Sequence, residues 1–175
     1  MDTDSIRRGL ITGLLTNLIV IALLVAASVA RADDTERSRL RVRMVEPLSV
    51  SKLADLDFGA MSVGSAGGTA VVNPRSQART VSGDVIEEGG NVSAAAFEVS
   101  GQNRLRYDII LPSSLTLHSG SSSMVVDSFT TNKRGNRGRL RGGRDTFRVG
   151  ATLNVAGNQA SGTYVGVFDV TVAYQ

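Results

Sequence analysis

The sequence closes with "YVGVFDVTVAYQ", residues 164–175, in which large apolar residues alternate with small or polar ones. Successive side chains of a β-strand point to opposite faces of the sheet, so this alternation predicts a strand over 163–174. One face of that strand carries Tyr164, Phe168, Val170, Val172 and Tyr174. Because the sequence ends there, we expect no following strand to pair with it.

Shorter segments of the same kind recur along the chain from about residue 38 onward, separated by turns rich in Gly, Asn and Ser at spacings of about ten residues. This rhythm predicts an all-β sandwich. No window after residue 33 shows the apolar period of a helix, and the glycine-rich "VGSAGGT", residues 63–69, is interpreted as a hairpin turn. The further strands expected are 38–45, 48–53, 56–61, 69–73, 79–86, 94–100, 104–111, 114–118, 123–130 and 146–155.

The N-terminus has the pattern of a secretion signal. Arg7 and Arg8 precede an uncharged apolar run over 9–30, and Ala30, Arg31 and Ala32 match a small-residue cleavage pattern. We therefore expect a signal peptide over 1–32, cleaved after Ala32, and an exported protein that passes through the periplasm to the cell surface. The run is also long enough to span a bilayer, which leaves an uncleaved signal anchor as the alternative.

The composition excludes several kinds of chemistry. The chain has no Cys and a single His, so disulfides, thiolate chemistry and zinc–thiolate sites are excluded. His118 has no nucleophile near it in sequence, and we interpret it as a solvated residue at a strand end. No phosphate-binding loop precedes a helix, because no helix is expected. We expect neither an enzyme nor a cofactor.

Two segments are rich in arginine. In "RSRLRVRMV", residues 37–45, arginines alternate with Ser38, Leu40, Val42 and Met44, so a strand there would have one cationic and one largely apolar face. The apolar face belongs either to the chain's own sheet or to that of a neighbour. Removal of 1–32 leaves the two signs of charge nearly balanced, and we expect no nucleic-acid partner.

The second arginine-rich segment is "NKRGNRGRLRGGRDTFR", residues 132–148. It is interpreted first as a solvated, mobile connection between strands 123–130 and 146–155. The alternative is an anion-binding loop for acidic surface glycan or lipid head groups. The basic residues of that loop are Lys133, Arg134, Arg137, Arg139, Arg141 and Arg144.

A series of short motifs gives the chain a family likeness. In order they are "MVEPLSV", "LDFG", "GTAVVNP", "AAFEVSG", "YDIILP", "VGATLNV" and "NQASGTYVGVFDVTVAYQ". Together they cover 40–175 and resemble a bacterial domain family of unknown function, related to spore-coat-U-type proteins and to the pilins of archaic chaperone–usher fimbriae. The resemblance implies an immunoglobulin-like, pilin-like sandwich that lacks one strand of its own. A periplasmic chaperone would fill the gap first, and the next subunit's N-terminal strand would then replace it.

The resemblance also implies a role for each part of the chain. An N-terminal arm over 33–46 would donate Leu40, Val42 and Met44 to the sandwich domain, 47–175, of a neighbour. The apolar face of 163–174 would line the acceptor groove and be recognised by the chaperone and an outer-membrane usher. We therefore expect a fimbrial subunit that forms a homopolymer by strand exchange. The alternatives are a monomeric envelope or coat protein in which 38–45 completes its own sandwich, and a module that binds acidic glycan.

Overall fold

The computed structural model of the protein describes residues 41–175, of which 44–175 form one compact unit. Extended segments dominate it, and a single turn of 3-10 helix, η1 (Arg134–Asn136), interrupts them. None of the described residues forms a helix long and apolar enough to cross a membrane. The strands are β1 (Ser49–Ala54), β2 (Met61–Val72), β3 (Arg79–Glu87), β4 (Ala95–Ser100), β5 (Arg106–Ile110), β6 (Ser114–Ser119), β7 (Ser122–Thr131), β8 (Arg137–Arg139), β9 (Arg144–Val155) and β10 (Thr171–Tyr174).

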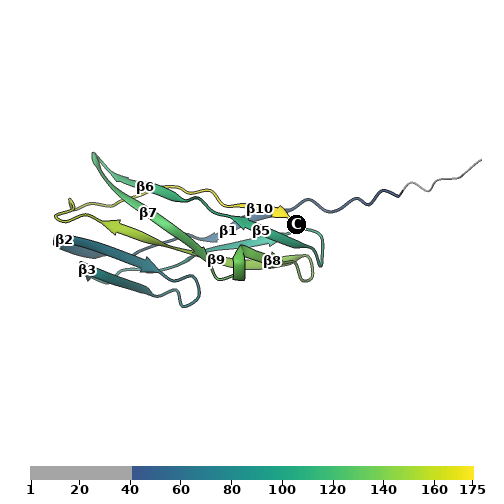
Figure 1. Cartoon of the computed structure of the whole chain (residues 1–175), viewed down its shortest axis with the longest axis horizontal. Coiled ribbons are helices and arrows are strands. Elements are labelled where there is room, and N and C mark those ends of the chain that lie inside the picture. The colour runs from purple at the N-terminus through teal and green to yellow at the C-terminus, as the bar shows by residue number, and fades with distance from the viewer. Residues whose placement is uncertain (1–40) are drawn as a thin grey trace, which may run out of the picture. The chain divides into compact units, whose positions relative to one another are not determined.

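Two antiparallel sheets pack against each other (Figure 1). In the larger sheet, the long strand β9 pairs with β4 along its first half and with β2 along its second half, while β7 lies on its other edge. Strands β1, β3 and β6 extend this sheet from β4, β2 and β7 respectively. The smaller sheet has the order β10-β5-β8. The predicted all-β sandwich is therefore confirmed.

The core is built from the inward-facing residues of both sheets. Phe97 of β4 and Phe147 of β9 stack with ring centroids 5.3 Å apart, and the fully buried Tyr107 of β5 belongs to the same cluster. A second cluster, which includes Val126 and Leu153, lies between β2, β3, β7 and β9. Buried residues alternate with partly exposed ones along β4 and along most of β9, where 149–151 are all buried, and this pattern brings one face of each strand into the core.

Most of the predicted strands are present, with three differences. Residues 63–69 are not a hairpin turn: they lie inside β2, where the pairing with β3 shifts register between Val63 and Gly68. The predicted strand 56–61 is reduced to one isolated bridge between Asp57 and Ser93. The predicted terminal strand is regular only over β10, since upstream of it Val165 forms a single bridge with His118.

The N-terminal predictions fall largely outside the described residues. The proposed signal peptide, its cleavage point after Ala32 and the donor residue Leu40 all precede residue 41. Of the predicted strand 38–45, the described part, 41–45, is exposed and contains no strand. The donor-arm hypothesis therefore stays a prediction.

Candidate functional site

A groove of about 960 Å³ opens along one side of the sandwich. One wall is the segment from the end of β1 to the start of β2, which includes Leu56, Phe58 and Met61. The other wall is the C-terminal segment 159–168, which precedes β10. The floor consists of core side chains and is apolar. It contains Phe97, Leu115, Leu117, Met124, Val126, Phe129, Leu153 and Val155.

The floor of the groove is the second core cluster seen from outside. Val126 and Leu153 are almost fully buried, whereas Leu115, Leu117 and Met124 are only partly buried. A sandwich normally covers such side chains with a strand, because exposed contiguous apolar surface costs free energy in water. The groove therefore leaves part of the second core cluster accessible to solvent.

The C-terminal wall presents unpaired backbone as well as apolar side chains. Among residues 41–175, no backbone hydrogen bond joins 166–170 to another backbone group, although β10 directly afterwards pairs fully with β5. Val165 and Val167 are 66% and 85% exposed. An open strand edge of this kind is a template for pairing with a further strand.

Close packing against β6 fixes the position of this wall. A Cβ atom added at Gly166 would lie 2.8 Å from Leu117 Cδ2 and 3.1 Å from the Thr116 carbonyl oxygen, so a larger residue there would require β6 or its side chains to shift. The ring of Phe168 contacts those of Phe129 and Phe97, at centroid distances of 5.2 and 6.3 Å. The wall is thus anchored from below while its outer side remains open.

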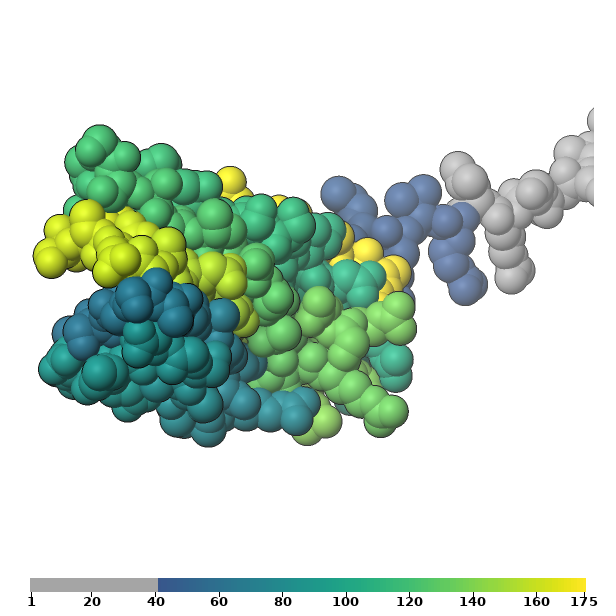
Figure 2. All heavy atoms as spheres, turned by 60° about the vertical axis from the view of Figure 1, so that its left-hand side comes forward, coloured from purple at the N-terminus to yellow at the C-terminus, as the bar shows by residue number. Residues whose placement is uncertain are grey.

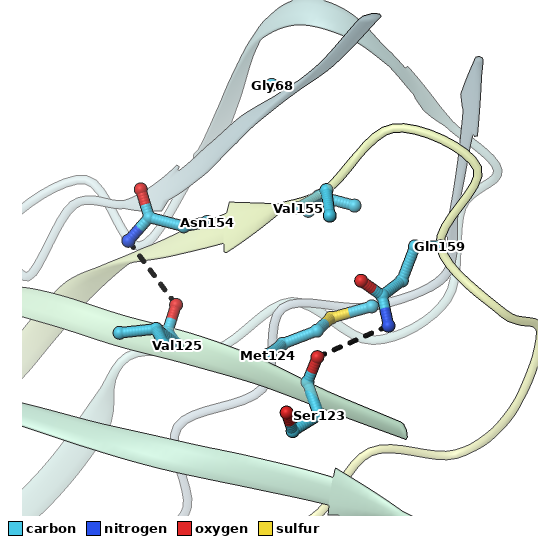
Figure 3. A pocket seen from close by; sticks show the side chains of 8 residues that line it. Gly68, Ser123, Met124, Val125, Asn154, Val155 and Gln159 are labelled. Atoms are coloured by element: carbon cyan, nitrogen blue, oxygen red, sulfur yellow. Dashed lines mark hydrogen bonds between the residues drawn. The ribbon is translucent and has the colours of Figure 1, made fainter. Parts of the chain in front are cut away.

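One end of the groove is closed by the connection that follows β9. Gln159 Nε2 donates a hydrogen bond to the Ser123 carbonyl (Figure 3) and another to the Tyr164 hydroxyl. The Asn158 amide donates to the Gly64 carbonyl. Figure 2 shows this connection, in yellow-green, between the β6–β7 hairpin and the β2–β3 pair. An open pocket of about 410 Å³ adjoins this connection and is lined by residues such as Met124 and Asn154.

The opposite wall is held by Arg79, a residue that the sequence did not single out. Its side chain is only 3% exposed, and Nη1 donates hydrogen bonds to the carbonyls of Phe58 and of Ala60, the latter at 2.9 Å. Its Nε lies 3.4 Å from the Glu87 carboxylate without forming a hydrogen bond. A buried arginine thus ties the groove wall to β3. No local signal marks this role, because it depends on contacts with residues about twenty positions away in the chain.

The predicted groove residues alternate as expected. Tyr164, Phe168, Val170, Val172 and Tyr174 are all partly buried, and the residues between them are exposed. Only Tyr164 and Phe168 line the groove. Tyr174 lies where the wall is already sealed, since its hydroxyl donates to the Glu46 carbonyl at 2.9 Å and accepts from the Gln102 amide at 2.7 Å. Of the predicted donor residues, Val42 and Met44 are 78% and 91% exposed.

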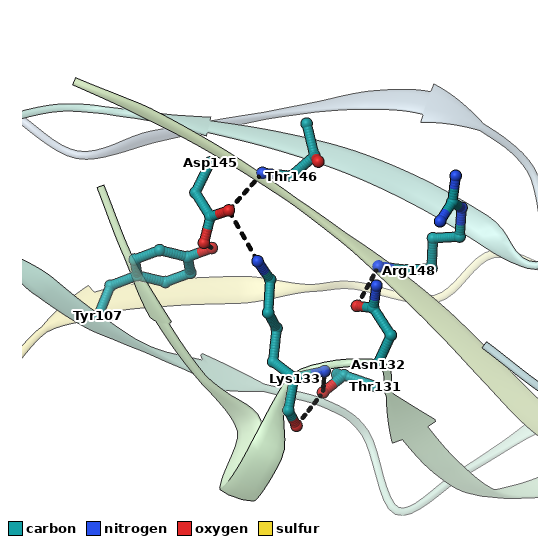
Figure 4. Close-up of polar contacts among 7 residues, drawn as sticks. All are labelled: Tyr107, Thr131, Asn132, Lys133, Asp145, Thr146 and Arg148. Carbon is teal, nitrogen blue, oxygen red and sulfur yellow. Dashed lines mark hydrogen bonds and ion pairs between the residues drawn. The ribbon is translucent and has the colours of Figure 1, made fainter. Parts of the chain in front are cut away.

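The arginine-rich segment 132–148 is not the simple hairpin connection that was expected. It contains η1 and β8, and β8 pairs with β5. Asp145 anchors it: its carboxylate accepts hydrogen bonds from Tyr107 at 2.9 Å and from Lys133 at 2.7 Å (Figure 4). Burial, together with the neighbouring Asp145 carboxylate, raises the pKa of Tyr107 far above its ordinary value of 10.0.

The remaining predicted loop residues are divided between paired and unpaired arginines. Arg137 lies 3.3 Å from the Asp108 carboxylate and Arg144 lies 3.1 Å from that of Glu98. Within residues 41–175, Arg134, Arg139 and Arg141 form no ion pair. The same part of the chain contains no group of three or more His, Cys, Asp or Glu side chains that could hold a metal ion.

Comparison with known proteins gives one match. A family model described as "Domain of unknown function (DUF4402)" matches residues 48–174. Neither a search of curated proteins nor a search of solved structures found a match to the chain. The matched region begins just before β1 and ends with β10, so it includes both walls of the groove and its floor.

Proposed function

The chain belongs to the DUF4402 family of domains of unknown function, and from this premise we propose that it is an exported structural subunit of a fimbria or other surface fibre. Each subunit would donate its N-terminal arm to the groove of the next one. The observation that carries the proposal is the groove of about 960 Å³, with its apolar floor, beside the unpaired backbone of 166–170. Strand addition to an open sheet edge is an established mode of recognition, and pilin donor-strand complementation is one of its known forms.

The dimensions and chemistry of the arm suit this groove. A donated strand of seven to nine residues would span about 23–30 Å at roughly 3.3 Å per residue. Leu40, Val42 and Met44 are spaced two apart, so in a strand all three side chains would point to the groove floor. The arginines between them would face solvent, where their charge would discourage uncontrolled pairing of edges.

The energy available from this arrangement is sufficient for a durable fibre. Val42 and Met44 are mostly exposed in the subunit, so nearly all of their apolar area remains to be buried. Three such side chains would contribute about 5–9 kcal/mol in total, at roughly 1.5–3 kcal/mol each. Each new backbone hydrogen bond to 166–170 would add about 0.5–1.5 kcal/mol.

The same groove makes a lone subunit prone to aggregation in transit. Its apolar floor and open edge would pair with any available strand. The proposal therefore includes a periplasmic chaperone that covers the groove after export. It also includes an outer-membrane usher at which the arm of the next subunit replaces the chaperone.

The experiment compares the mature protein, 33–175, with a variant that lacks 33–45. The intact protein is expected to form a ladder of multimers on unboiled denaturing gels, and the truncated protein is expected to remain monomeric. A synthetic peptide of residues 37–45 should then bind the truncated protein and raise its thermal unfolding midpoint. The matched control is the same peptide with Leu40, Val42 and Met44 replaced by Ser. Normal multimers from the truncated protein, or a compact monomer from the intact one in which 38–45 resists protease, would refute the proposal.

A further inference from the structure

Two turns at one end of the smaller sheet are joined by backbone hydrogen bonds. The turn before β5 and the turn between β8 and β9 exchange bonds from Arg104 N to Leu140 O (2.9 Å) and from Leu140 N to Leu105 O (3.0 Å). A third bond runs from Gly101 N to Gly143 O (2.9 Å). These bonds hold β5 and β8, with their adjoining turns, in a fixed relation at the end of the domain that also carries the C-terminus in Figure 1.

Four exposed arginines gather on this framework. Arg106 of β5 and Arg139 of β8 are directly opposite each other in the sheet register. Arg104 lies two positions before Arg106, and Arg141 lies two positions after Arg139. Directly opposed residues in an antiparallel pair have Cβ atoms about 4.5–5.5 Å apart, and like charges in that position destabilise the sheet. We call these four residues, Arg104, Arg106, Arg139 and Arg141, the arginine surface.

The four residues of the arginine surface have no ion-pair partner within the described part of the chain. Nearby Arg137 and Arg144 each have a carboxylate partner, Asp108 and Glu98 respectively. None of the four residues of the arginine surface forms an ion pair with any other residue of 41–175. Repulsion between opposed arginines therefore remains uncompensated in the isolated subunit.

The backbone at Arg104 supports a binding role for this surface. Its φ of +69° lies in the left-handed region, which side chains other than glycine seldom adopt. The conformation is held by the bond from Arg104 N to Leu140 O and by a contact from Arg139 Nε to the Arg104 carbonyl at 3.4 Å. Backbone strain maintained by surrounding contacts is characteristic of binding sites.

From these observations we propose that the arginine surface binds the sulfate or carboxylate groups of an acidic polysaccharide. Guanidinium groups bind such planar or tetrahedral anions through two parallel hydrogen bonds. Arg106 and Arg139 lie on neighbouring strands, and Arg104 and Arg141 lie in the turns that adjoin them, so the four side chains offer several guanidinium groups to anionic groups repeated along an extended chain. Nucleic acid is a poorer fit, because single strands need exposed aromatic rings for stacking and Tyr107, the aromatic residue of β5, is fully buried.

This site is separate from the proposed strand-acceptor groove. None of the residues of the arginine surface lines the groove. Binding to a polysaccharide therefore requires neither a free groove nor a polymer, and the two proposals can fail independently.

The test compares binding of heparin, a sulfated polysaccharide, to the full mature chain and to two double variants. Arg106→Ser with Arg139→Ser removes the opposed pair. Arg75→Ser with Arg148→Ser removes the same net charge at positions outside the arginine surface. We expect the first variant to bind heparin about tenfold more weakly or worse, and the second to bind as the wild type does. Affinity of the wild type should fall as salt is added, because exposed charges are screened.

Further measurements separate the alternatives. The thermal midpoint of the Arg106→Ser, Arg139→Ser variant should equal or exceed that of the wild type, because repulsion is removed; a marked decrease would overturn the argument from repulsion. Equal loss of heparin binding in both variants would show that binding depends only on net charge. It would refute the proposal that the arginine surface is a specific binding site. Stronger arginine-dependent binding to phosphatidylserine vesicles or to single-stranded oligodeoxythymidylate would overturn the assignment of the ligand to polysaccharide.

Discussion

Val42→Asp is the substitution that tests strand donation most directly. Val42 is 78% exposed in the subunit, so the change should leave the stability of the subunit itself almost unaltered. In a fibre the same side chain would be buried, and its loss would remove about 1.5–3 kcal/mol of apolar burial. Burial of the new carboxylate adds a desolvation cost of several kcal/mol. The sum, about 3 kcal/mol or more, corresponds to a subunit–subunit affinity weakened at least about 100-fold.

The matched control introduces the same residue one position earlier. Arg41 would lie on the solvent face of a donated strand, so Arg41→Asp should not bury a carboxylate. Both variants are assayed by the multimer ladder on unboiled gels, and circular dichroism and thermal unfolding confirm that each subunit is folded. We expect the ladder to disappear with Val42→Asp and to persist with Arg41→Asp.

Two results would contradict this reasoning. A normal ladder from Val42→Asp would mean that Val42 does not enter the groove. Equal loss of the ladder in both variants would mean that the arm acts through charge rather than through an alternating apolar face. In either case the strand-donation hypothesis would have to be abandoned for this arm.

Three further predictions concern the domain itself. Gly138→Ala should lower the free energy of unfolding in urea by about 1–3 kcal/mol, because an added Cβ would lie 2.1 Å from the buried Tyr107 ring. Tyr107→Phe should cost about 0.5–1.5 kcal/mol at neutral pH through the lost bond to Asp145. That difference should shrink as pH rises above about 10, because unfolded Tyr107 then ionises while the folded side chain, whose pKa is raised, keeps its proton. Arg79→Ala should destabilise the domain by about 3 kcal/mol in the same urea assay and weaken the ladder, because the wall at Phe58 loses its anchor.

The sequence predicted best where the structure follows local periodicity. The alternation of 164–175 is reproduced in the burial of each side chain, although only 171–174 is regular strand. An extended chain that lies over a core can bury the side chains of one face without any neighbouring strand. Regular backbone hydrogen bonding, in contrast, requires a neighbouring strand aligned residue by residue. Upstream of β10 the only such pairing among the described residues is the bridge to His118. The alternation of side-chain burial is therefore present there, whereas regular backbone hydrogen bonding is not.

Glycine-rich 63–69 was misinterpreted because glycine also permits bulges. Gly67 has a φ of +73°, and the Ala66 amide donates to the Asp84 carboxylate on the paired strand. A carboxylate on β3 thus supports an irregular stretch of β2 without reversing the chain. Nothing in the local sequence distinguishes such a bulge from a hairpin turn, because the partner that decides between them is about twenty residues away.

The conformation of residues 132–148 likewise depends on contacts with residues distant in the sequence. Asp145 is the only acidic residue of that segment, and its composition favoured a solvated loop. In the structure its carboxylate meets the Tyr107 hydroxyl across the core, and Gly138 leaves room for that ring. This part-buried contact joins residues almost forty positions apart, and the edge strand β8 pairs with β5 about thirty positions earlier, so local sequence periodicity could indicate neither.

The position of Tyr174 bears on whether the arm could fill the groove of its own subunit. The Tyr174 hydroxyl is bonded to the Glu46 carbonyl, which places the start of the arm beside the end of β10. The groove wall begins at Phe168, six residues earlier, about 20 Å away along an extended chain. Met44 is two residues from Glu46 and can lie at most about 7 Å from it. An arm that starts there would have to run back along the domain to reach Phe168, so the strand-donation hypothesis predicts that its apolar side chains enter the groove of another copy rather than that of their own subunit.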